Sequence, residues 1–197
     1  MRRIETAILI SGRGSNMAAL IEAARAPDFP ARIRLVVADR TDAGGLALAD
    51  AAGVETLTIA PKAVGGRPGF EAALDAALTA RAVELICLAG FMRILSADFV
   101  GRWRALNIHP SLLPAYKGLN THARALADGA REHGATVHWV APELDSGEIV
   151  AQARVVVLPG DDPERLAARV LEAEHALYPA ALRAVCLRLD VTPTGAR

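Results

Sequence analysis

Aromatic side chains, net charge and cysteine are all scarce in this chain. Aromatic residues make up only 4% of the 197 residues, so Ala, Leu, Val and Ile must fill the interior. Lys and Arg together number 22, as do Asp and Glu, and no basic stripe or tail stands out, so the charge pattern argues against a nucleic-acid partner. The two cysteines, Cys87 and Cys186, lie in apolar or helix-like segments, which predicts buried, reduced thiols.

Long hydrophobic runs are also missing. No segment approaches the roughly 20 apolar residues that a membrane-spanning helix needs, so we expect no membrane partner. The positively charged start, residues 1–3, is followed by an apolar stretch at residues 7–10 that is too short for the core of a secretory signal. We therefore expect a soluble, cytoplasmic protein.

Short β-rich runs alternate along the chain with Ala-rich helical stretches. Strands are expected at residues 6–11, 33–38, 54–59, 85–89, 106–108, 136–140 and 149–158. Helices are expected at residues 16–25 and 46–52, at a segment marked by Phe70, Leu74 and Leu78, and from Pro163 onward, where Leu166, Val170, Ala173 and Leu177 repeat at helical spacing.

This alternation predicts an α/β fold. We expect a Rossmann-like open, mostly parallel sheet with helices on both faces, in which the later edge strands can be antiparallel. No linker or internal repeat divides residues 1–197, so we expect a single domain. Ligands of such sheets bind outside the carboxyl ends of the strands, and three polar clusters are expected there.

The first cluster, Ser11 to Asn16, lies between the first strand and the first helix. Glycines let a ligand approach the backbone, and the N–H groups of a helix N-terminus favour an anion. The same residues are equally consistent with a plain tight turn. A dinucleotide fingerprint would need a third glycine where Met17 stands, although Asp39, after the second strand, suits a nicotinamide cofactor.

The second and third clusters contain the other candidate reactive groups. Asn107 and His109 alternate along a strand and therefore share a face, where an amide and an imidazole could stabilise an oxyanion and move a proton. Residues 143–147 follow a neighbouring strand, and a carboxylate there could face His109 and favour its charged form. For the second cluster, the alternative is that Asn107 and His109 only form hydrogen bonds to the backbone of the loop. For the third cluster, the alternative is a turn that happens to contain acidic residues.

Four further histidines complete the candidate reactive side chains. They lack the spacing of zinc ligands, so we expect no metal, and surface or loop positions account for most of them: His122, His133, His138 and His175.

Six segments together resemble the phosphoribosylglycinamide formyltransferase family. They are residues 10–16 (ISGRGSN), 88–95 (LAGFMRIL), 107–114 (NIHPSLLP), 132–138 (EHGATVH), 143–147 (ELDSG) and 174–179 (EHALYP). The third segment alone indicates only the wider formyltransferase superfamily. The glycine loop and the last segment narrow the resemblance to the phosphoribosylglycinamide formyltransferase family. One departure is the pair Ala38 and Asp39, where the family usually has Ser-Asn.

The resemblance implies an activity and a set of site residues. The activity is transfer of the formyl group of 10-formyltetrahydrofolate, the co-substrate, to the amine of 5-phosphoribosylglycinamide (GAR) in purine biosynthesis, with no metal and no nicotinamide. The implied catalytic residues are Asn107, His109 and Asp145. The implied GAR-binding residues are Gly14, Ser15, Asn16 and Glu174. The implied folate-binding residues are Arg67, Met92, Arg93, Ile94, Leu95, Asn107, Ala141, Pro142, Glu143, Leu144 and Asp145. The implied partners are small-molecule substrates. The implied oligomeric state is a monomer or a homodimer.

Four other functions compete with this one. A related hydrolase discards the formyl group to water but normally carries an extra N-terminal domain. A related enzyme formylates initiator tRNA and needs a C-terminal RNA-binding domain. A nicotinamide-dependent oxidoreductase would rest on Gly12, Gly14 and Asp39. A non-catalytic binding domain would not need Asn107 and His109 together with Asp145.

Overall fold

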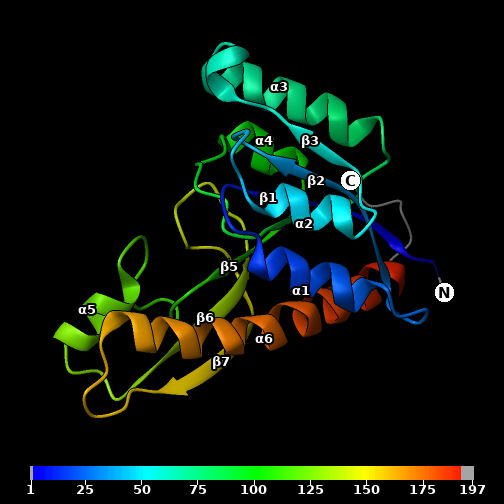
Figure 1. The fold of residues 1–197 in the computed structure, drawn as a ribbon. Coiled ribbons are helices and arrows are strands. Elements are labelled where there is room, and N and C mark those ends of the chain that lie inside the picture. The colour runs from blue at the N-terminus through cyan, green and yellow to red at the C-terminus, as the bar shows by residue number, and fades with distance from the viewer. Residues whose placement is uncertain (1, 192–197) are drawn as a thin grey trace.

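The computed structural model describes residues 2–191 and contains one sheet of seven strands in the order β3-β2-β1-β4-β5-β6-β7 (Figure 1). The strands are β1 (Ile4–Ile10), β2 (Ala31–Ala38), β3 (Thr56–Thr58), β4 (Leu85–Leu88), β5 (Ala105–His109), β6 (Glu132–Trp139) and β7 (Ile149–Val156). The first five pair in parallel, and β5–β6 and β6–β7 pair antiparallel.

Helices cover both faces of this sheet (Figure 1). They are α1 (Ser15–Ala24), α2 (Gly45–Ala51), α3 (Gly66–Thr79), α4 (Ala97–Arg102), α5 (Thr121–Ala127) and α6 (Pro163–Val191), with a short 3-10 helix η1 (Pro61–Ala63). The α1, α2 and α6 helices share a core with one set of alternating strand residues, including Ile8 and Cys87. The α3 and α4 helices pack on the opposite set, including Leu9 and Leu88. The central strand β4 is therefore apolar on both sides, as the run at residues 85–89 predicted.

The predicted mostly parallel α/β fold is confirmed, with local differences. Only β7 is an edge strand at the later side, because β6 lies between β5 and β7. Helix α3 already begins at Gly66, inside the expected loop at residues 61–69, and two short helices, α4 and α5, were not expected.

The buried face of α6 also differs from the predicted apolar stripe. Glu174 and Tyr178 lie in the interior, whereas Ala173 and Leu177 are half-buried. The Tyr178 hydroxyl lies 3.1 Å from the carbonyl oxygens of both Leu88 and Leu106, so it bridges neighbouring strands from the helix side. The polar residue at position 174 interrupts the hydrophobic spacing. The sequence pattern therefore predicted Ala173 and Leu177 as the buried positions, each one residue before the residue that is buried in the structure.

Both cysteines are free and buried, as the sequence predicted. Burial raises the pKa of the Cys87 thiol well above its usual range.

The order of the strands marks where a ligand is expected. From β1 the chain proceeds to β2 and β3 on one side, and then crosses back to β4 and β5 on the other. Crevices form at the carboxyl ends of strands where this reversal occurs, here between β1 and β4. Ser11, directly after β1, accepts a hydrogen bond from the Met92 N–H at 2.9 Å and joins the loops on the two sides.

Candidate active site

Strands β5 and β6 bring four polar side chains to one face of the sheet. In their antiparallel register Asn107 lies opposite His138, and His109 lies opposite Thr136. The residues between them, including Ile108 and Val137, point into the core on the other face. The alternation that predicted a common face for Asn107 and His109 is therefore confirmed.

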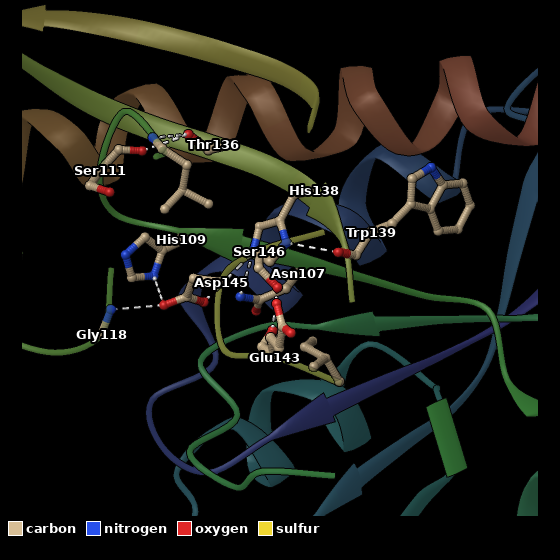
Figure 2. A network of polar contacts seen from close by, with 12 residues as sticks. Asn107, His109, Ser111, Gly118, Thr136, His138, Trp139, Glu143, Asp145 and Ser146 are labelled. Atoms are coloured by element: carbon tan, nitrogen blue, oxygen red, sulfur yellow. Dashed lines mark hydrogen bonds and ion pairs between the residues drawn. The ribbon is translucent and has the colours of Figure 1, made fainter. Parts of the chain in front are cut away.

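His109 is buried and lies between two oxygen acceptors. Its Nδ1 atom is 3.4 Å from the Asp145 Oδ2 atom, and its Nε2 atom is 2.9 Å from the Tyr116 carbonyl oxygen. Figure 2 shows the His109 imidazole and the Gly118 backbone N–H both directed at the Asp145 carboxylate, with the Gly118 N–H donating to Asp145 Oδ2 at 2.8 Å. The structure thus brings the predicted His109 and Asp145 together.

Asp145 reaches His109 by a route that the sequence analysis did not anticipate. Because β6 is antiparallel, its last residue, Trp139, lies opposite Leu106, near the start of β5. Residues 140–148 then fold back over the sheet toward His109. Asp145 itself has a φ of 48°, a left-handed conformation that Asp adopts more readily than most residues. The prediction that a carboxylate following a neighbouring strand could face His109 is confirmed.

Close packing at Gly147 holds this loop against the sheet. A Cβ atom at this position would lie 1.7 Å from the Trp139 carbonyl oxygen, so only glycine fits there. The Ser146 hydroxyl also donates to the Glu143 carbonyl at 2.9 Å.

The loop after His109 is tied to β6 and β7 by Thr136. The Thr136 hydroxyl donates to the Ser111 carbonyl at 2.6 Å and accepts from the Leu113 N–H at 3.0 Å. Gln152 of β7 donates to both the Thr136 hydroxyl and the Leu113 carbonyl, each at 2.9 Å. These bonds fix the segment whose Tyr116 carbonyl faces His109.

His138 is the principal residue of this site that the sequence analysis missed. Surface or loop positions were expected for most of the four further histidines, but His133 and His138 are both buried in β6. Burial lowers the pKa of His138, so the ring is neutral at pH 7, and its Nδ1 lies 2.8 Å from the Trp139 carbonyl. A proton on Nδ1 leaves Nε2 as an acceptor for the Asn107 amide, 3.2 Å away.

The start of α1 forms a second, separate group of predicted residues. Gly14 adopts a φ of 76°, and a Cβ there would lie 2.8 Å from the Gly45 Cα, so both left-handed backbone and close packing require glycine. Among residues 2–191 no side chain caps the helix at Gly14, and the first backbone N–H groups of a helix lack intrahelical partners. The predicted anion site therefore has free donors at Ser15 and Asn16.

Asn16 connects this helix to the last one. Its Nδ2 atom donates to the Glu174 Oε2 atom at 2.7 Å. Glu174 is only 6% exposed, and burial raises the pKa of its carboxyl group, opposed by the Asn16 hydrogen bond. The structure thus joins two of the residues predicted to bind GAR.

The residues predicted to border the folate are divided among several environments. Met92, Ile94 and Leu144 expose large apolar side chains and are called the apolar rim below, whereas Leu95 is buried in the core. Arg93 forms an ion pair with the buried Asp39. Ala141 is half-buried, and Pro142 and Glu143 are exposed. Arg67 is exposed on α3, and no hydrogen bond or ion pair among residues 2–191 joins it to the others.

Within the described part of the chain, no three His, Cys, Asp or Glu side chains gather where they could hold a metal ion. Over the same residues, no helix combines the length and apolar character that crossing a bilayer requires.

Comparison with known proteins gives the class to which this fold and site belong. The family model described as formyl transferase matches residues 4–182. The phosphoribosylglycinamide formyltransferase of Escherichia coli (strain K12) is 45% identical over 174 residues, which cover 87% of this chain and 82% of that protein. The crystal structure of the enzyme of that name from Brucella melitensis has a TM-score of 0.91 and 49% identity, and the match covers 100% of this chain and 98% of that chain. The chain belongs to the phosphoribosylglycinamide formyltransferase family.

A longer relative shows the same similarity over a small part of its length. The trifunctional purine biosynthetic protein adenosine-3 of Gallus gallus is 49% identical over 185 residues. These residues are 93% of this chain but only 18% of that protein, so the chain spans less than a fifth of it.

Proposed function

We propose that this protein transfers the formyl group of 10-formyltetrahydrofolate to the amine of GAR, giving formyl-GAR and tetrahydrofolate for purine biosynthesis. The observation that carries the proposal is the arrangement of Asn107, His109 and Asp145 on one face of β5, in a chain of this family. An amide, an imidazole and a carboxylate in this arrangement suit acyl transfer to an amine.

The chemistry begins when the GAR amine attacks the formyl carbon. A carbon–nitrogen bond forms and the carbonyl electron pair moves to oxygen, so the tetrahedral intermediate carries negative charge there. Donors from Asn107 and a protonated His109 would meet this oxygen, ideally at about 2.7–3.1 Å. The Asp145 carboxylate, 3.4 Å from the His109 ring, stabilises the cationic imidazole.

Collapse of the intermediate completes the transfer. The bond between the formyl carbon and N10 of the folate breaks, and its electron pair returns to N10. The proton lost by the attacking amine is the proton that N10 gains, and His109 and Asp145 are the groups placed to pass it, directly or through water. Neither reactant is oxidised or reduced in this sequence.

The residues at the start of α1, together with Glu174, would bind GAR. The N-terminus of α1 at Gly14, Ser15 and Asn16 would hold the substrate phosphate. Glu174, held by Asn16 at 2.7 Å, would accept hydrogen bonds from the ribonucleotide. Support for this assignment comes from the uncapped N-terminus and from the buried carboxylate beside it.

The folate would lie along the loop between β4 and α4 and against residues 141–145. The apolar rim offers Met92, Ile94 and Leu144 to a flat ring system, and Asn107 and Asp145 lie at its reactive end. Arg67 and Arg93 supply positive charge for the folate carboxylates. We propose that both reactants are small molecules and that the reaction uses neither a metal nor a nicotinamide. We also propose that the protein is cytoplasmic and is a monomer or a homodimer.

One assay tests the transfer. The protein is mixed with 10-formyltetrahydrofolate, with and without GAR, and release of deformylated folate is followed. We expect release that requires GAR. Release without GAR would indicate the hydrolase, and no release would leave a binding or redox protein. The redox alternative has its own readout, because a nicotinamide nucleotide that raised the melting temperature would support it.

A further inference from the structure

Helix α3 contacts α4 through two carboxylates, one at each end of the shorter helix. Glu71 of α3 accepts hydrogen bonds from Ser96, the N-cap residue of α4. One turn further along α3, Asp75 accepts a hydrogen bond of 2.8 Å from the Nε1 atom of Trp103, the C-cap residue of α4. Both carboxylates therefore hold α4, but only Glu71 also holds the end of the loop that precedes it.

The contact at Ser96 uses both carboxylate oxygens of Glu71. Oε1 accepts the Ser96 N–H at 2.6 Å, and Oε2 accepts the Ser96 hydroxyl at 2.5 Å. The same hydroxyl accepts the Phe99 N–H at 3.2 Å and so caps α4. Hydrogen bonds to an ionised acceptor are roughly twice as strong as those between neutral groups. Glu71 is therefore a strong and directional anchor for the residue at which the β4–α4 loop ends.

The neighbouring residue of α3 holds the other end of this loop. Phe70 and Phe91 stack with their ring centroids 6.0 Å apart, and both side chains are buried. Between the two anchored ends, Met92 and Ile94 of the apolar rim are 71% and 63% exposed. Because the anchors are adjacent residues of one helix and the loop between them is short, they determine how the loop presents these two side chains.

We propose that Glu71 is a positioning residue for the proposed reaction, which holds the backbone of the apolar rim through Ser96 and does not itself contact a reactant. The inference rests on the proposed function. Without this contact the loop would adopt other conformations, and the folate would have to order it on binding, which lowers affinity. Asp75 has no such effect, because its partner Trp103 follows α4 and leads into β5.

The test measures the Kd of a 10-formylfolate analogue by calorimetry, without GAR. Glu71→Ala removes both acceptors, and we expect a Kd roughly five- to tenfold higher, the value of about one hydrogen bond. Glu71→Gln keeps the shape and one acceptor oxygen, so it should recover part of the affinity. Asp75→Ala should leave the Kd unchanged. In steady-state assays the KM for the folate should rise in Glu71→Ala, with little change in kcat or in the KM for GAR.

Asp75→Ala is the matched control, because it removes a bond between the same two helices. Urea unfolding should show a comparable loss of stability for Glu71→Ala and Asp75→Ala, so the difference between their Kd values reports on positioning alone. An equal rise in Kd for both variants would overturn the inference, and so would an unchanged Kd in Glu71→Ala.

Hydrogen exchange separates this inference from the proposed function, because it requires no ligand. The Met92 N–H donates to the Ser11 hydroxyl at 2.9 Å and is not in contact with Glu71, so its exchange reports on the loop as a whole. Glu71→Ala should accelerate this exchange, and Asp75→Ala should not. Unchanged exchange would overturn the inference even if the native protein showed GAR-dependent transfer. Accelerated exchange in a protein without transfer activity would support the anchoring role and overturn the proposed function alone.

Discussion

Asn107 and His138 lie directly opposite each other in the β5–β6 ladder, with the amide Nδ2 atom 3.2 Å from the imidazole Nε2 atom. The Trp139 carbonyl engages the other ring nitrogen, so a neutral His138 can only accept the amide hydrogen. This contact determines which way the Asn107 amide points (Figure 2). We therefore propose that His138 is a positioning residue, which acts on the proposed reaction through Asn107.

Replacing His138 tests this relationship. His138→Phe keeps a ring in place but removes the acceptor, so the amide of Asn107 can rotate. We expect kcat to fall roughly tenfold, the value of about one hydrogen bond, with little change in KM for GAR. Asn107→Ala removes the donor itself and should cost roughly a hundred- to a thousandfold. Equal losses from both substitutions would mean that His138 contacts the reactants directly.

A second prediction concerns the 3.4 Å contact between His109 and Asp145. Asp145→Asn keeps the shape but removes the charge, so turnover should fall strongly and substrate affinity less. If the two residues act as one unit, His109→Ala combined with Asp145→Asn should cost much less than the product of the single losses. The measurement is a double-mutant cycle on turnover, with folding checked by circular dichroism. Multiplicative losses would reduce the catalytic group to Asn107 and His109.

Glu174 should show opposite effects on stability and on binding. Because burial raises its pKa, the folded protein loses stability as the pH rises above the usual range of a glutamate and the carboxyl group ionises. Glu174→Gln stays neutral and can still accept from Asn16, so we expect it to be more stable at pH 8, by on the order of 1 kcal/mol, with the advantage shrinking toward pH 4. The KM for GAR should rise. Urea unfolding at several pH values checks the first effect, and a variant less stable at pH 8 would contradict it.

The buried His133 predicts acid sensitivity. Burial lowers its pKa from 6.5 to about 4, with His122 adding to the effect, while the Pro110 backbone opposes it. The unfolded chain therefore binds more protons between these values, so stability is complete above pH 6.5 and is lost as the pH falls toward 4. One such group contributes a slope of up to about 1.4 kcal/mol per pH unit. His133→Gln should reduce the pH dependence of the free energy of unfolding, measured in urea, between pH 7 and pH 4.5. An unchanged slope would mean that other groups cause the acid sensitivity.

The proposed phosphate site is best tested at Ser15. Gly14→Val is the obvious change, but its side chain would collide with Gly45 as well as block the ligand, so lost activity would not separate the two effects. Ser15→Ala removes only a hydroxyl from a half-buried position and adds no atoms, so it should raise the KM for GAR several-fold, the value of about one hydrogen bond, without changing the Kd of a folate analogue. A parallel loss of both affinities would point to a folding defect.

Sequence reasoning anticipated the fold, and which residues lie near His109, better than it anticipated the hydrogen-bond partners and burial of individual side chains. The sheet followed from apolar strands alternating with helices, and the pairing of Asn107 with His109 followed from the two-residue strand repeat. His138 was missed because its partner depends on the register of an antiparallel pair, which one strand's sequence does not specify. The buried position of Glu174 was missed because hydrophobic periodicity does not mark a polar residue inside a core.

The hydrogen bond between Asn16 and Glu174 joins residues 158 positions apart. During synthesis the N-terminus of α1 leaves the ribosome long before α6 exists, and domains fold as units as the chain emerges. The proposed ribonucleotide site is consequently among the last features to be completed, whereas β5, with Asn107 and His109, is made much earlier. A ribosome-bound chain that lacked α6 would keep the proposed phosphate donors at the start of α1 but lack Glu174, so the proposed acceptor site is complete only after α6 has been made.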